Sequence, residues 1–156
     1  MRRKLLTLLG AAVLVGALVV PSLVLAAGNP ANKLKAHMTG AQVVPSGQGA
    51  PAGDGNARIT LRPAKQKICF RVTYHSIGST KGLNAGIYTG EKGKNGDLYE
   101  KLFTGDKSSP VEGCAKNVSS AHLKALRQKP SSFHVNVKTD KYPKYGAIRG
   151  QLKPRS

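Results

Sequence analysis

The chain has 156 residues, of which 25 are Lys or Arg and only 7 are Asp or Glu, so its formal net charge at pH 7 is +18. This length leaves room for one domain once the ends of the chain are set aside. So large a charge imbalance implies self-repulsion and favours attraction to polyanions.

The first 26 residues have the organisation of a secretory signal peptide. A basic start at residues 2–4 precedes an apolar run over residues 5–20, and small residues precede Ala27. The alternative is an uncleaved membrane anchor, because residues 5–27 are just long enough to span a bilayer. Cleavage after Ala26 would leave 130 residues with 22 basic against 7 acidic side chains, a formal charge of +15. We expect a linker at residues 27–32 and one domain over residues 33–153.

Two cysteines in a chain bound for an oxidising compartment predict one disulfide, Cys69–Cys114. Closing a loop of about 46 residues stabilises a fold by roughly 4 kcal/mol in the chain-entropy model. Cys69 falls on the outward face of its predicted strand, whose core face carries Phe70 and Val72. Either the disulfide lies on the outer side of the sheet, or a bulge shifts the register there.

Alternation of apolar and polar residues predicts a series of short strands along the chain. They cover residues 33–38 (continuing through 39–45), 57–62, 67–75, 82–90, 98–103 and 111–118. Residues 46–56 are rich in Gly, Pro and small polar residues, so we expect a mobile loop. Residues 91–96 predict a turn. Ser119 and Ser120 offer an N-cap for a short helix over residues 121–129, which Pro130 ends.

The chain closes with a predicted β-hairpin. Phe133, Val135, Val137 and Thr139 fall on one face of the first strand, and His134, Asn136 and Lys138 fall on the other. A turn over residues 140–146 leads to a second strand over residues 147–152. No helix follows each strand, which excludes a parallel sheet. The whole pattern predicts an all-β fold, an antiparallel immunoglobulin-like or superoxide-dismutase-like β-sandwich with one short helix near the C-terminus.

This hairpin has the sequence Val-Asn-Val in its first strand and Ile-Arg-Gly-Gln-Leu in its second. It closely resembles the end of the CHRD domain, the extracellular repeat first recognised in chordin. The resemblance spans residues 35–152 and implies a binding or scaffolding module outside the cell. The family-motif positions are Gln42, Pro45, Gly90, Asn136, Arg149, Gly150 and Gln151. For Asn136 and Arg149 we expect a structural use, each satisfying the other or nearby carbonyls. Gly150 predicts a bulge or a close approach of two backbones.

Histidines of the family pattern are missing from this chain. Their positions carry Gly86, Tyr88 and Lys138, so the imidazoles that could converge on one sheet face as metal ligands are absent. His75 and His134 remain as weak metal candidates, which would have to meet across neighbouring strands. We expect no cofactor. A metal-binding or redox protein like the copper–zinc dismutases is the alternative interpretation.

Catalytic patterns are also missing from the sequence. It has no G-x-S-x-G nucleophile elbow, and a disulfide would remove both thiols as nucleophiles. We therefore predict a non-enzymatic protein, secreted, periplasmic or extracellular, that binds an anionic envelope polymer or lipid surface, or an extracellular protein. Nucleic acid is not an expected physiological partner of an exported chain. The polyanion-binding candidates are Lys33, Lys35, Arg58, Arg62, Lys65, Lys67, Arg71, Lys138, Lys141 and Lys144. A low-pH habitat is another explanation of the charge, since few carboxylates means little stability lost on acidification.

Overall fold

The computed structural model describes residues 31–156, so the predicted signal peptide and most of the predicted linker lie outside the described residues. Nine strands, one α-helix and three short 3-10 turns make up the described chain. The strands are β1 (Lys33–Thr39), β2 (Asp54–Arg62), β3 (Lys67–His75), β4 (Asn84–Thr89), β5 (Leu98–Thr104), β6 (Val111–Ala115), β7 (Phe133–Lys138), β8 (Ile148–Gln151) and β9 (Lys153–Pro154). Helix α1 is Ser120–Gln128, and the 3-10 turns are η1 (Gly40–Gln42), η2 (Pro63–Lys65) and η3 (Pro130–Ser132).

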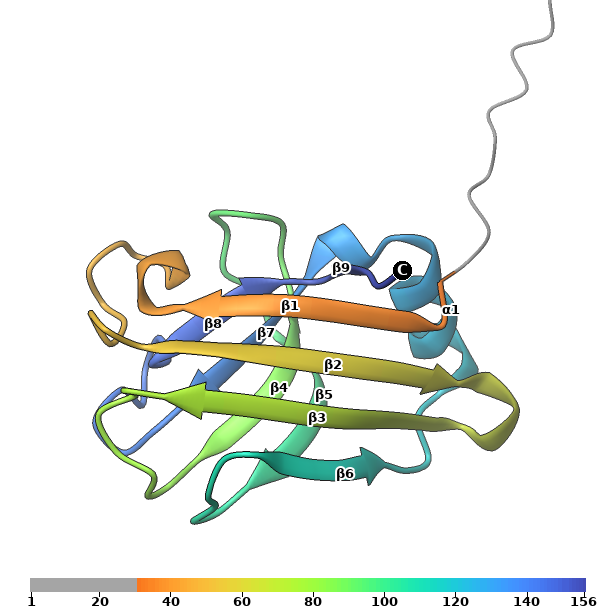
Figure 1. The fold of residues 1–156 in the computed structure, drawn as a ribbon. Coiled ribbons are helices and arrows are strands. Elements are labelled where there is room, and N and C mark those ends of the chain that lie inside the picture. The colour runs from red at the N-terminus through yellow and green to blue at the C-terminus, as the bar shows by residue number, and fades with distance from the viewer. Residues whose placement is uncertain (1–30) are drawn as a thin grey trace, which may run out of the picture.

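The strands form one antiparallel sheet in the order β5-β4-β7-β8-β1-β2-β3-β6, with β9 beside β1. The sheet folds over itself, so that β1, β2, β3 and β6 lie in front of β4, β5, β7 and β8 (Figure 1). Its two end strands, β5 and β6, come close together without a shared hydrogen-bonded ladder, and the sheet nearly closes into a barrel. The predicted all-β, antiparallel fold with one short helix near the C-terminus is confirmed.

Inward-facing side chains of both layers form the core. Ile68, Val72 and Val135 are fully buried, as is Ile148 on β8. Alternation along β3 places Phe70 and Tyr74 on the same inward face, as its sequence predicts. Helix α1 begins where the serines predict, because the Ser119 hydroxyl accepts a hydrogen bond from the His122 amide at 3.1 Å.

The connection between β1 and β2 differs from its prediction. The first strand does not continue beyond Thr39, because the chain turns at Gly40, whose amide donates to the Gly53 carbonyl at 3.0 Å. A Cβ at Gly40 would lie 1.8 Å from the Ala50 carbonyl oxygen, so only glycine fits here. Ala50 is 1% exposed, and its amide donates to the Ala147 carbonyl at 2.8 Å. The glycine-rich loop is thus anchored on the C-terminal hairpin by backbone contacts that its composition does not reveal.

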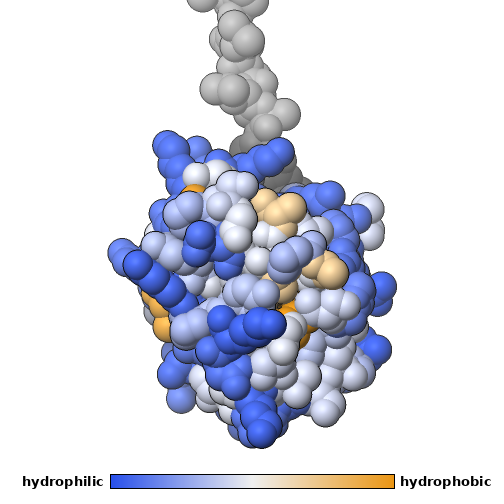
Figure 2. All heavy atoms as spheres, turned by 90° about the vertical axis from the view of Figure 1, so that its left-hand side faces the viewer, coloured by the Kyte–Doolittle hydropathy of each residue, from blue (hydrophilic) through white to orange (hydrophobic). Residues whose placement is uncertain are grey.

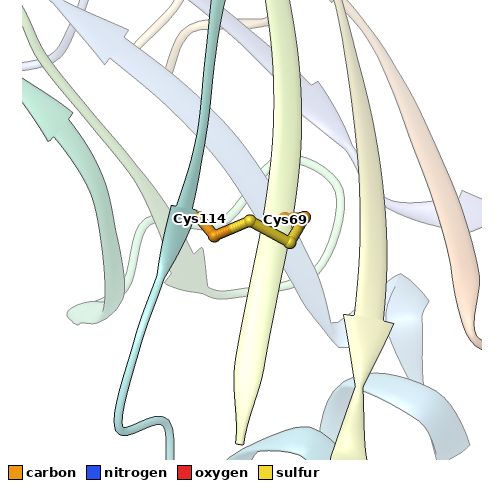
Figure 3. Close-up of a disulfide and its surroundings, with 2 residues drawn as sticks. All are labelled: Cys69 and Cys114. Carbon is orange, nitrogen blue, oxygen red and sulfur yellow. A yellow bond between two sulfur atoms is a disulfide. The ribbon is translucent and has the colours of Figure 1, made fainter. Parts of the chain in front are cut away.

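Cys69 and Cys114 form the predicted disulfide, which joins β3 to β6 (Figure 3). The two residues lie directly opposite each other in an unbroken β3–β6 register, between the pairs Ile68–Ala115 and Phe70–Gly113. Cys114 is exposed and Cys69 is half-buried. Of the two alternatives left by the sequence, the disulfide on the outer side of the sheet is the correct one.

Replacing both cysteines, as Cys69→Ala with Cys114→Ala, should lower the free energy of unfolding by about 4 kcal/mol, because the unfolded chain regains the freedom of the open loop. Urea unfolding followed by circular dichroism measures the change. Reduction of the unsubstituted protein serves as the control and should give a similar loss. A loss below about 1 kcal/mol would contradict the chain-entropy account.

Candidate functional site

The outer face of β1, β2 and β3 carries a row of basic side chains that crosses the sheet. Lys35 lies opposite Arg58, and Arg58 lies opposite Arg71. Adjacent strands are about 4.8 Å apart, so three positive side chains follow one another at that spacing. Like charges directly opposite each other in a sheet are destabilising. The row therefore lowers the stability of the sheet, and an anion bound across it would offset this loss.

Only one member of this row has a carboxylate partner among residues 31–156. Arg71 Nη1 donates to Glu112 Oε1, which lies opposite it on β6. Both side chains are about half exposed, 51% and 56%, so water screens their attraction. Lys35 and Arg58 form no ion pair within the described part of the chain. Two positive charges of the row are thus left uncompensated.

An open groove of about 840 Å³ follows this basic row. Lys35, Arg58, Arg71 and Arg155 supply its positive charges, and Asn56, Thr73 and Ser156 add other polar groups. Four cations with hydrogen-bonding groups between them are a suitable lining for an oxyanion. Such a lining has the charge and the donors that phosphate, sulfate or carboxylate groups require.

Two histidines share one carboxylate on the same outer face, where β1 and β3 end and β2 begins. His37 Nε2 lies 3.3 Å from Asp54 Oδ2, and His75 Nε2 lies 3.2 Å from Asp54 Oδ1. The imidazoles are 57% and 68% exposed and the carboxylate is 33% exposed. The Asp54 carboxylate therefore pairs with these two histidines and not with the basic row, and Glu112 pairs only with Arg71.

The structure brings together three of the predicted polyanion-binding residues in the groove, Lys35, Arg58 and Arg71. Lys33, Arg62, Lys65 and Lys67 lie elsewhere on β1, on β2, in η2 and on β3. The hairpin lysines have other surroundings. Lys138 Nζ lies 5.5 Å above the Tyr88 ring, and Lys144 Nζ lies 4.9 Å above the Tyr145 ring. Lys141 lines a separate hollow together with Lys144.

A second polar cluster lies on the face of β7 and β8 that points away from the core. His134, Asn136 and Arg149 are only 1%, 5% and 2% exposed. The alternation in β7 predicts a solvated face there, but the 90–97 connection covers it. Asn136 and Arg149 lie opposite each other and bond to carbonyls rather than to one another. The structural use expected for both is thus seen, in its carbonyl-bonded form.

Arg149 holds the turn between β4 and β5. Its Nη2 donates to the carbonyls of Glu91 at 3.0 Å and Lys94 at 2.6 Å, and its Nη1 donates to Asn95 Oδ1 at 3.3 Å. Gln151 Nε2 donates to the Gly90 carbonyl at 3.0 Å. The neighbouring Gly150 is a close approach and not a bulge, since a Cβ there would lie 2.2 Å from the His37 carbonyl oxygen.

His134 is held neutral in this cluster. Burial, reinforced by the positive charge of Arg149, lowers its pKa to about 4, against a smaller raising effect of its bond to the Gly90 carbonyl. Because that carbonyl only accepts, the Nδ1 atom 3.2 Å away carries the proton. The ring stacks on Tyr88, with centroids 5.8 Å apart. These contacts make His134 a structural side chain.

The predicted meeting of His75 and His134 does not occur. Their strands, β3 and β7, are not neighbours in the sheet, and one imidazole pairs with Asp54 while the other is buried beside Tyr88. No group of three or more His, Cys, Asp or Glu side chains in residues 31–156 is placed to hold a metal ion.

The three family-histidine positions do share one face of the sheet. Gly86 lies opposite Asn136, and Lys138 lies over Tyr88. A Cβ at Gly86 would be only 2.6 Å from Leu98 Cδ1. This face is therefore filled by a leucine, a tyrosine and a lysine in place of imidazoles.

Comparison with protein families matches residues 34–152 to the CHRD domain. The chain belongs to the CHRD domain family. This match covers nearly all of the described chain and confirms the resemblance of the hairpin. Comparisons with curated proteins and with solved structures gave no match. CHRD domains are typically extracellular, and no helix within residues 31–156 is long and apolar enough to cross a membrane.

Several of the CHRD motif residues, which are far apart in the sequence, lie close together in the fold. Gln42, Arg149 and Gln151 line the same pocket, and Gly90 is bonded to Gln151. Pro45 lies between two lining residues, Val44 and Ser46. In the sequence these positions are recognisable only by their resemblance to the family, which does not reveal that they meet. The one sequence signal for their meeting is the run of polar side chains on the second face of a hairpin strand.

His134 should make the CHRD domain sensitive to acid. A histidine that has pKa of about 4 when folded and an ordinary value near 6.5 when unfolded takes up its proton more readily in the unfolded chain. The free energy of unfolding should therefore fall as the pH drops from about 6.5 to about 4, by at most ~3 kcal/mol from this group. Below that window the effect should be complete.

The matched variant is His134→Gln, whose amide can still donate to the Gly90 carbonyl but does not titrate. Urea unfolding of both proteins between pH 7 and pH 4 gives the measurement, and the other three histidines are common to both. The variant should lose less stability on acidification. Parallel pH profiles for the two proteins would show that His134 is not the acid-sensitive group.

Proposed function

We propose that this CHRD-domain protein is exported and acts without catalysis, by binding an anionic polymer or an anionic lipid surface of the cell envelope through the groove on β1, β2 and β3. The observation that carries the proposal is the row Lys35–Arg58–Arg71, in which like charges lie directly opposite one another. Repulsion of this kind is relieved by an external anion more fully than by one exposed carboxylate, Glu112.

The shape of the groove supports a polymeric or surface-bound partner over a single small anion. It is open, and its cations extend across three strands, so several anionic groups of one partner can be contacted together. Each contact with an exposed cation is weak, and the sum of several is needed for affinity. The formal charge of +15 that remains after cleavage of the predicted signal peptide also steers a negative partner towards the protein over longer distances.

Loops 40–53, 76–83 and 139–147 meet at the end of the molecule where β1 and β3 end. The surface of this end is compatible with an anionic polymer or lipid surface as the partner. Figure 2 shows this end as mostly hydrophilic, with hydrophobic residues in small separate spots. This face lacks the broad apolar area typical of an obligate protein contact. Its largely hydrophilic surface favours an anionic partner over an apolar protein partner.

Removing one groove charge should weaken binding to a polyanion more than removing a charge elsewhere. We expect Arg58→Gln to reduce affinity for dextran sulfate about three- to tenfold at low salt, and to lower the salt dependence of binding. Lys101→Gln is the matched control, since Lys101 is an exposed cation on β5 and its loss changes the net charge equally. It should change affinity less than twofold.

Retention on immobilised dextran sulfate at rising salt, compared with uncharged dextran, gives the measurement. Thermal unfolding shows that both variants remain folded. Equal losses in the two variants would mean that only net charge matters. Retention no different from that on uncharged dextran would overturn the proposed function itself.

A further inference from the structure

A second pocket, distinct from the basic groove, lies between the residues that follow β1 and the connection from β4 to β5. It has a volume of about 350 Å³. Its lining includes Gln42, Val43, Val44, Lys92, Arg149 and Gln151. Asn95 Nδ2 donates to the Val44 carbonyl at 2.9 Å, which ties the two walls together. The pocket is thus held open by contacts within the fold, as preformed ligand sites are.

Arg149 is a buried charge without an anionic partner. It is 2% exposed, and its acceptors are two backbone carbonyls and one side-chain amide oxygen, all of them uncharged. No carboxylate within residues 31–156 forms an ion pair with it. Glu91 accepts through its backbone, and its side chain is exposed. The positive charge at the wall of the pocket is therefore bonded but not neutralised.

A buried guanidinium that bonds only to uncharged acceptors is an unusual arrangement. A buried charge is normally paired, because neutral acceptors return only part of the free energy that its removal from water costs. Burial lowers the pKa of Arg149, which reflects the same cost. An arginine has five N–H groups, and the three bonds named above leave Nε–H and one Nη1–H without an acceptor in the described chain. A bound anion would pair with the charge and with these donors together.

The other residues that line the pocket indicate which class of anionic ligand fits it. Lys92 is exposed and adds a second cation at the pocket. Val43, Val44 and Ala41 supply a small apolar surface, and Gln42 and Ser46 supply polar groups. A group with one negative end and a short apolar body matches this lining better than a bare inorganic anion does.

We propose that this pocket binds a small organic carboxylate, with Arg149 and Lys92 facing the carboxylate and Val43 and Val44 contacting the apolar body. This site differs from the groove in its chemistry, because it takes one small ligand and not a polymer. Its place among the CHRD motif residues gives those residues a binding role in addition to their structural one.

The test uses butyrate as the probe and its neutral isostere butyramide as the comparison, by titration followed in amide NMR spectra. Butyrate should bind saturably and shift the signals of residues around Gly93 and Gln151, and butyramide should bind at least tenfold more weakly. No saturable butyrate binding, or equal binding of the two compounds, would overturn the proposal.

Two variants locate the binding. Ala41→Phe places a ring at the exposed rim of the pocket and should weaken butyrate binding at least tenfold. Ala121→Phe, at an exposed position on α1, is its control and should leave binding unchanged. Lys92→Ala changes no buried packing and should weaken binding two- to fivefold, which keeps the test independent of whether the phenylalanine variant folds.

Arg58→Gln separates this pocket from the polyanion groove. Butyrate binding should survive this substitution, since Arg58 lies in the groove alone. Loss of butyrate binding in Arg58→Gln with retention in Ala41→Phe would place the carboxylate in the groove and refute the pocket site. Dextran sulfate binding without butyrate binding would leave the proposed function intact and reject this inference alone.

Discussion

The buried guanidinium of Arg149 is the constraint on which this end of the fold depends. Because it is removed from water, its N–H groups need acceptors, and it takes them from the turn after β4. The turn is thereby drawn across the outer side of β7 and β8. His134 becomes buried as a result, and Gln151 reaches the Gly90 carbonyl. Together with the bond from Asn136 to the Tyr145 carbonyl, this charged side chain explains why a hairpin strand with an alternating sequence is buried on both faces.

Much of the fold could be predicted from local patterns. The bounds predicted for strand β3 are those that the structure shows, since each of its inward positions is apolar and its outward positions, apart from Cys69, are polar. Alternation reports only which face points to the core, and it assumes that the other face meets water. For β7 that assumption is wrong, because residues far along the chain cover the second face. The same limitation explains the loop before β2, where Ala50 is anchored by the distant Ala147.

The candidate site was predictable in composition but not in arrangement. The outward positions of Lys35, Arg58 and Arg71 follow from alternation, and so they were expected to carry surface charge. Whether they lie opposite one another depends on the register between three strands, which turn geometry and long-range packing set. The register pairs them in one row, whereas Lys138 lies above an aromatic ring on the other layer. The convergence of Gln42 with Arg149 likewise required the tertiary structure.

This arrangement also bears on the three explanations of the high charge. A charge that served only solubility would be expected to be spread out, because directly opposed cations reduce stability. Adaptation to an acidic habitat favours few carboxylates, and it also favours few buried groups that resist protonation. His134 is such a group, since both its burial and Arg149 oppose its protonation. A fold under selection for acid stability would gain from a non-titrating residue there. The opposed cations in the groove and the neutral histidine on β7 therefore favour an anionic partner as the explanation of the charge.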